Sequence, residues 1–110
     1  MAILDRVQLL RDFISEEPEN PFNYYALALE LREKDLQETA ALFDFLLREH
    51  VDYLPVYFPS AHFFAELGAI QKAGQIFANG ILLATNLSDE KTLKELKNAY
   101  QNFLFENDLD

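Results

Sequence analysis

Few residues of this chain have the types and spacing that chemistry requires. His62 lies four residues before Glu66, so on a helix both side chains would point the same way. Two ligands of this kind are too few for a structural or catalytic metal site. The sequence has no cysteine, no glycine-rich phosphate loop, no Glu-x-x-His pair and no nucleophile with a base beside it. We therefore predict no catalytic, cofactor-binding or metal-binding residue and no enzyme activity.

The net charge of the chain restricts the partners that it could bind. With 19 acidic and 9 basic residues, the formal charge is −10 at pH 7. Such a chain repels phosphate backbones and anionic lipids, so we expect neither nucleic acid nor a membrane surface as a partner. Solubility is the ordinary reason for this acidity, and an acidic docking surface for a basic partner is the alternative. The N-terminal residues lack the apolar stretch of a secretory signal, so we expect a cytoplasmic protein.

The charged residues are unevenly distributed along the chain. Residues 53–88 contain two of them, Glu66 and Lys72, whereas the other 74 residues contain 26. A helix pair that faces solvent normally carries more charge than this. We therefore expect this segment either to be core or to be covered by a partner or by a second copy of the chain.

The spacing of the apolar residues predicts helices as the elements that hold these side chains. Val7, Leu10 and Ile14 recur at three- and four-residue steps, and similar steps continue along the chain. The period-two alternation that is typical of strands is absent. We predict six helices and an acidic tail, near residues 2–16, 21–33, 36–50, 54–67, 70–85, 88–105 and 106–110.

Local signals indicate where these helices begin and end. Asp52 is a candidate cap for the fourth helix, whose first turn would hold Pro55. Pro59 lacks the N–H that would bond to the carbonyl of Pro55, so we expect a late start or a kink there. Gly68 should end that helix, and Ser88 should cap the last one.

Two stretches of the chain repeat each other. Tyr24, Leu27, Ala28 and Leu31 align with Tyr57, Ser60, Ala61 and Phe64 at an offset of 33 residues, and Thr39 and Phe43 align with Ala73 and Phe77 at an offset of 34. A period of this size is typical of repeat architectures, in which stacked units bury a shared core.

The repeated residues resemble the tetratricopeptide repeat, a 34-residue helix–turn–helix unit. Its pattern is an aromatic residue, a Leu-Gly pair, a second aromatic, Ala-x3-Phe and a closing proline. The second unit departs from the pattern at Ser60 and Ala61, and Thr85 replaces the closing proline. In the first unit Thr39 replaces the alanine and Val51 the proline. The resemblance is good over about residues 18–86 and weak at the two ends.

The resemblance implies an all-α fold, a TPR-like α-solenoid of antiparallel helix pairs with about six helices. We predict one domain over residues 1–110, with repeats at 21–50 and 54–86. Residues 2–16 would form an N-terminal flanking helix and residues 88–105 a C-terminal capping helix. The residues expected to be buried include Phe43, Phe64, Ala73 and Phe77. A helical bundle without repeats is the alternative.

In folds of this family, the first helix of each pair lines the concave face. The residues that would point into it, and that we predict to bind a partner, are Tyr25, Leu29, Arg32, Phe58, His62 and Glu66. Such a groove would be aromatic and apolar at its centre. Repeats that grip the C-terminal carboxylate of a peptide use Lys, Arg and Asn in these places. Those residues are largely absent here, which argues against a clamp of that kind.

The sequence thus predicts a non-catalytic protein–protein interaction module without a cofactor, which binds a partner protein or peptide through an apolar concave groove. The alternative is a self-associating structural protein, a homodimer whose interface is the uncharged segment 53–88. The mass of the protein in solution separates these two hypotheses. A third hypothesis, an enzyme accessory or metal protein, would be revealed by metal analysis of the purified chain.

Overall fold

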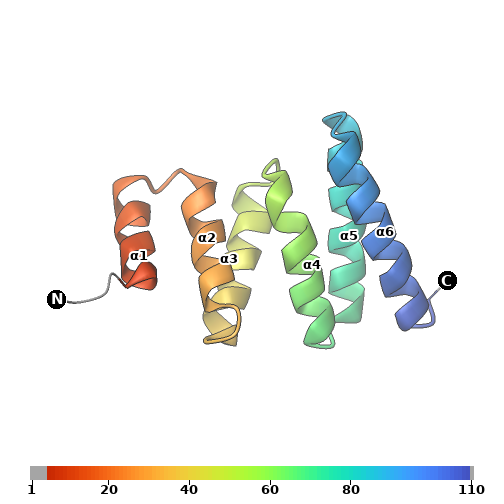
Figure 1. Ribbon diagram of the computed structural model, residues 1–110, viewed down its shortest axis with the longest axis horizontal. Coiled ribbons are helices and arrows are strands. Elements are labelled where there is room, and N and C mark those ends of the chain that lie inside the picture. Colours follow the sequence, from red (N-terminus) through yellow and green to blue (C-terminus); the bar gives the residue numbers. More distant parts are fainter. Residues whose placement is uncertain (1–4, 110) are drawn as a thin grey trace. The chain divides into compact units, whose positions relative to one another are not determined.

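The computed structural model describes residues 5–109, and within them the chain is helical without a strand. The elements in chain order are α1 (Arg6–Glu16), α2 (Pro21–Leu31), α3 (Leu36–Glu49), the 3-10 helix η1 (Leu54–Val56), α4 (Tyr57–Glu66), α5 (Ile70–Asn86) and α6 (Glu90–Glu106) (Figure 1). The predicted all-α fold with six α-helices is confirmed. Residues 2–4 of the first expected helix and Asp110 of the expected acidic tail lie outside the described residues. None of the helices in the described range has both the length and the apolar character needed to cross a bilayer.

The helices form two compact units, Met1–Tyr53 and Leu54–Asp110. In the first unit α2 packs against both α1 and α3, and in the second α5 packs against both α4 and α6. Consecutive helices within each unit run in opposite directions, so they form antiparallel pairs (Figure 1). The repeat boundaries and the single domain over residues 1–110 stay predictions.

A small cluster of leucines holds the first unit together. It consists of Leu10, Leu27 and Leu31, with Val7, Ile14, Ala26 and Leu42 packed around them. Two N-caps position the helices that carry these leucines. The side chain of Asp5 accepts a hydrogen bond from the N–H of Val7, and Asn20 does the same for Phe22 ahead of α2. Each cap satisfies one N–H group that the first turn of a helix leaves without an intrahelical partner.

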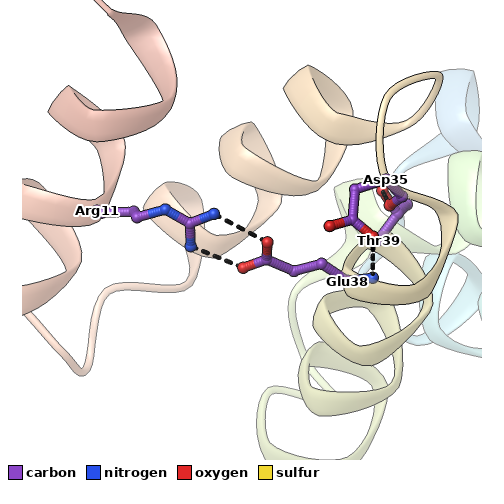
Figure 2. Close-up of polar contacts among 4 residues, drawn as sticks. All are labelled: Arg11, Asp35, Glu38 and Thr39. Atoms are coloured by element: carbon purple, nitrogen blue, oxygen red, sulfur yellow. Dashed lines mark hydrogen bonds and ion pairs between the residues drawn. The ribbon is translucent and has the colours of Figure 1, made fainter.

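An ion pair between α1 and α3 also stabilises the first unit. The guanidinium of Arg11 donates to both carboxylate oxygens of Glu38, at 2.7 and 2.8 Å (Figure 2). The backbone N–H of Glu38 itself donates to Asp35, the N-cap of α3, at 3.0 Å. Arg11 thereby holds the pKa of the Glu38 carboxyl below its usual range, chiefly through the hydrogen bond and against the opposing effect of desolvation. The cap and the ion pair together fix the start of α3.

The departures from the repeat pattern are accommodated by local hydrogen bonds. Thr39, which replaces an alanine, is fully buried, and its hydroxyl donates to the carbonyl of Asp35 at 2.9 Å. The buried hydroxyl of Ser60 donates to the carbonyl of Tyr57 at 3.3 Å. Thr85, in the place of the closing proline, donates to the carbonyl of Ile81 at 2.8 Å. Polar residues therefore fit at these positions because each hydroxyl bonds to the preceding turn of its own helix.

Aromatic side chains dominate the core of the second unit. Phe77 of α5 packs against Tyr100 and Phe103 of α6, with ring centroids 5.6 and 5.3 Å apart. The predicted core residues are all buried as expected, Phe43 in the first unit and Phe64, Ala73 and Phe77 in the second. Burying a phenylalanine stabilises a fold by about 1.5–3 kcal/mol, so these rings are a main source of stability.

The structure corrects two predicted helix caps. Asp52 does not cap α4, because the 3-10 helix η1 intervenes and the N-cap of α4 is Val56, which makes no side-chain cap bond. Ser88 does not cap α6, because it adopts a left-handed conformation (φ 56°) after α5. Asp89 is the N-cap instead and accepts from the N–H of Thr92. The expected late start of the fourth helix and its end before Gly68 (φ 85°) are confirmed.

Candidate functional site

Three of the residues predicted to bind a partner lie on α4. Phe58, His62 and Glu66 are spaced four residues apart and are exposed. Phe58 keeps 44% of its surface exposed, although it is a large apolar side chain. The Nε2 atom of His62 lies 3.6 Å from a carboxylate oxygen of Glu66. The helical spacing thus places the three side chains on one strip of α4.

These three residues line one side of a cleft in the second unit, with a volume of about 390 Å³. We call it the α4–α6 cleft. The other residues that line it are Ala65, Phe77, Ala99, Asn102, Phe103, Glu106 and Asn107. Phe77 and Phe103 are buried and form an aromatic floor, while Glu66, Asn102 and Glu106 are exposed at the rim. The cleft therefore offers apolar contact at its base and polar groups around its mouth.

Close packing of α4 against α5 determines which side of α4 faces this cleft. Gly80 of α5 lies so near Tyr57 that a Cβ atom on it would come within 2.8 Å of the Tyr57 Cβ. Tyr57 is buried by this approach, whereas the next residue, Phe58, lies about 100° further round the helix and stays exposed. The positive φ of Gly68, which glycine adopts without strain, then turns the chain back into α5.

Sequence reasoning missed the residues that α6 contributes to the cleft. Asn102 and Glu106 are one helical turn apart, as are Ala99 and Phe103, and all four line the cleft. This spacing equals that of Phe58, His62 and Glu66 on α4. This four-residue spacing is the signal in the sequence that indicates them, whereas the repeat pattern predicts only a capping role for the last helix.

The other three predicted residues lie in the first unit. Tyr25 and Leu29 on α2 are half-buried, and Arg32 at the end of α2 is exposed. The rings of Tyr25 and Tyr53 meet edge to face, with centroids 5.6 Å apart. Burial raises the pKa of the Tyr25 phenol, with Arg32 opposing, so this phenol is neutral at physiological pH. A single groove that contains both these three residues and the three on α4 stays a prediction.

The other described residues show few arrangements that suit metal binding or catalysis. Among residues 5–109 no group of three or more His, Asp or Glu side chains is placed to hold a metal ion. His50 at the end of α3 lies against two aromatic rings, with its ring centroid 5.7 Å from Phe45 and 6.4 Å from Tyr24.

Comparison with known proteins supplies relatives of known structure. A solution NMR structure of a tetratricopeptide repeat domain protein from Salinibacter ruber is 32% identical to this chain, with a TM-score of 0.73. It covers 79% of this chain, and 89% of its own length is matched. A crystal structure of a tetratricopeptide repeat domain protein from the same organism is 30% identical, with a TM-score of 0.71 and coverages of 76% and 96%. No protein-family model and no curated protein matches the sequence.

Proposed function

This chain belongs to the tetratricopeptide repeat family, and on that premise we propose that it is a non-catalytic protein-interaction module whose α4–α6 cleft holds a segment of its partner. One observation carries the proposal. Phe58, His62 and Glu66, which the repeat register alone predicts as partner-binding residues, line a single cleft over two buried aromatic rings, Phe77 and Phe103.

The dimensions and composition of the cleft support this proposal. Ligand pockets range from about 300 to 1,000 Å³, and a cleft of about 390 Å³ lies at the small end of that range. It suits one or two side chains of a peptide better than a whole cofactor. Phe58 at the mouth is an exposed aromatic residue of the kind that anchors protein interfaces.

We extend the proposal to the predicted residues of the first unit, as a second contact region for the same partner. Tyr25 presents a neutral phenol, and Leu29 beside it is partly exposed. Arg32 provides a cation one turn further along. The support for this extension is the repeat register, because Tyr25 and Leu29 occupy in α2 the positions that Phe58 and His62 occupy in α4.

The homodimer hypothesis loses part of its argument in this fold. Of the 21 apolar residues in segment 53–88, 10 are buried, including Phe63, Phe64, Ile76 and Phe77. Burial in the core therefore accounts for part of the scarcity of charge in this segment. The large apolar side chains that remain exposed are Phe58, Leu67, Leu82 and Leu87, at 44%, 49%, 61% and 54%.

Two of these exposed residues, Phe58 and Leu82, provide a matched test of the proposed function. Phe58→Glu places a charge at the cleft, and Leu82→Glu places the same charge on α5 outside the lining of the cleft. Proteins that bind the tagged chain in an extract of its own cells would be quantified for the wild type and both variants, with circular dichroism as the check on folding. We expect Phe58→Glu to lose the partner, because burying an unpaired carboxylate is costly, and Leu82→Glu to keep it.

Two results would contradict the proposal. A partner that binds Phe58→Glu as well as it binds the wild type would place the binding site elsewhere. A wild-type dimer that Phe58→Glu converts to a folded monomer, measured by sedimentation, would favour the homodimer instead.

A further inference from the structure

The rim of the α4–α6 cleft is acidic on two sides. Glu66 is the last residue of α4, Glu106 is the last residue of α6, and both line the cleft. Apart from His62, the other polar residues of the lining are the amides Asn102 and Asn107. Neither lysine nor arginine is among the lining residues. The cleft therefore presents carboxylates on both walls above an aromatic floor.

The ends of the two helices add to this negative potential. The carbonyl groups at the C-terminus of a helix carry partial negative charge, which cations stabilise and anions do not. Neither α4 nor α6 has a basic residue in its last turn, and each ends on a glutamate. Both helices run antiparallel to α5, so their C-termini lie at the same end of the unit (Figure 1). The N-terminus of α5, which carries partial positive charge, lies at this end too, so the complementarity of the cleft to a cation comes mainly from the two glutamate carboxylates.

We propose that the α4–α6 cleft binds an arginine side chain from a basic segment of the partner protein. This inference rests on the proposed function and specifies the chemistry of the partner. The guanidinium would lie between Glu66 and Glu106, whose carboxylates accept its N–H groups, and the methylene stem would pack on the aromatic floor of Phe77 and Phe103. The net charge of −10 would attract such a segment over a longer range.

Arginine fits this site better than lysine for geometric reasons. A guanidinium is planar, has five N–H donors in a fixed arrangement and can donate to carboxylates on two sides at once. It is also weakly hydrated and packs favourably against aromatic rings. The ammonium of lysine is compact and strongly hydrated, so it would lose more on entering a cleft with an aromatic floor.

Short peptides test the proposal on the full chain. The probes are acetyl-Leu-Arg-Leu-amide and the same peptide with glutamine or lysine in place of arginine, titrated into ¹⁵N-labelled protein and followed by amide chemical shifts. One double variant, Glu66→Gln with Glu106→Gln, neutralises the rim. Its control, Glu33→Gln with Glu95→Gln, removes the same charge from exposed residues that do not line the cleft.

We expect the arginine peptide to shift amide signals of Phe58, His62 and Asn102 and to bind at least about tenfold more tightly than the glutamine peptide, because charge-assisted hydrogen bonds are lost with glutamine. The rim variant should reduce that affinity to the level of the glutamine peptide, and the control variant should leave it within about twofold. Equal affinity for the arginine and glutamine peptides, equal affinity for the arginine and lysine peptides, or an equal loss in the control variant would overturn the proposal.

The two proposals fail in different ways. If Phe58→Glu loses the cellular partner but the arginine peptide does not bind selectively, the cleft is the binding site and its ligand is not arginine. If Phe58→Glu keeps the partner, the proposed function itself is wrong.

Discussion

The two units of this chain are built from helices of the same repeat pattern and both have apolar cores, but the contacts that join their helices around those cores differ. In the first unit, charged side chains join separate helices, as Arg6 does with Glu30 at 2.9 Å and Arg11 with Glu38 at 2.7 Å, beside one aromatic pair between α2 and α3, Tyr24 with Phe45. In the second unit, the contacts between α5 and α6 are aromatic, from Phe77 to Tyr100 and Phe103. The repeat pattern therefore specifies where helices meet, and leaves open whether charge or aromatic packing stabilises the contact.

This difference has a consequence for how each unit responds to change. Exposed ion pairs contribute little each and are screened by salt. Aromatic packing is insensitive to salt, but it depends strongly on volume, because a close-packed core relaxes only partly around a cavity. Substitutions in the aromatic core of the second unit should therefore have larger effects than substitutions in the ion pairs of the first, whose small contribution depends on pH and ionic strength.

The largest expected effect is the loss of the central ring of the second unit. Phe77 is 3% exposed, and Phe77→Ala should lower the free energy of unfolding by about 3–5 kcal/mol. Phe13→Ala in the first unit is the control, because that ring is 40% exposed and should cost less than about 1 kcal/mol. Urea unfolding followed by circular dichroism measures both. A cost below about 1 kcal/mol for Phe77→Ala would remove Phe77 from the core and break the repeat register.

Two glycines of α5 offer a finer test of close packing in the second unit. A Cβ atom on Gly80 would come within 2.8 Å of Tyr57, whereas one on Gly74 would have its nearest neighbour, an atom of Phe103, at 3.5 Å. Gly80→Ala should therefore destabilise the protein by about 1–3 kcal/mol through overpacking. Gly74→Ala should be neutral or stabilise it by up to about 1 kcal/mol, because alanine favours the helix. Thermal melting of both variants gives the sign of each change in stability. Equal changes in the two variants would mean that α4 and α5 are not in tight contact.

The sequence predicted much of this fold because its helices are strongly periodic and their breakers are clear. Gly68 and Pro21 mark helix ends that the structure places within a residue of the expectation. The wrong caps, Asp52 and Ser88, have a physical explanation. Ser88 and Asp89 can both cap a helix, and the choice depends on how α5 ends, which is a matter of backbone conformation rather than of residue type.

The candidate site was predictable only on one wall. Phe58, His62 and Glu66 follow from the register of the repeat, since four-residue spacing places them on one face of a helix. The wall formed by Asn102 and Glu106 depends on how α6 is rotated about its axis when it packs on α5. The spacing of Leu96 and Phe103 indicates which face of α6 packs on α5, but it does not indicate that Asn102 and Glu106 beside that face would stand opposite α4.

The smallest effect, and the one that tests the charged half of the comparison, concerns Arg11 and Glu38. Their side chains are 41% and 31% exposed, so we expect a coupling of about 0.5–1 kcal/mol at neutral pH. A double-mutant cycle with Arg11→Gln and Glu38→Gln separates this coupling free energy from the other effects of each substitution. Urea unfolding of the four proteins measures it, and added salt should reduce it.

The pH dependence of this coupling has a definite sign. Arg11 lowers the pKa of Glu38 in the folded state, so the carboxylate is favoured by folding. The stabilisation is complete above the ordinary carboxyl pKa of 4.5 and is lost as the pH falls below it through the folded value. The coupling measured at pH 7 should therefore persist to about pH 5 and decline toward pH 3. A coupling near zero at pH 7, or one that does not change down to pH 3, would show that the first unit does not depend on this ion pair, and the contrast with the aromatic second unit would rest on composition alone.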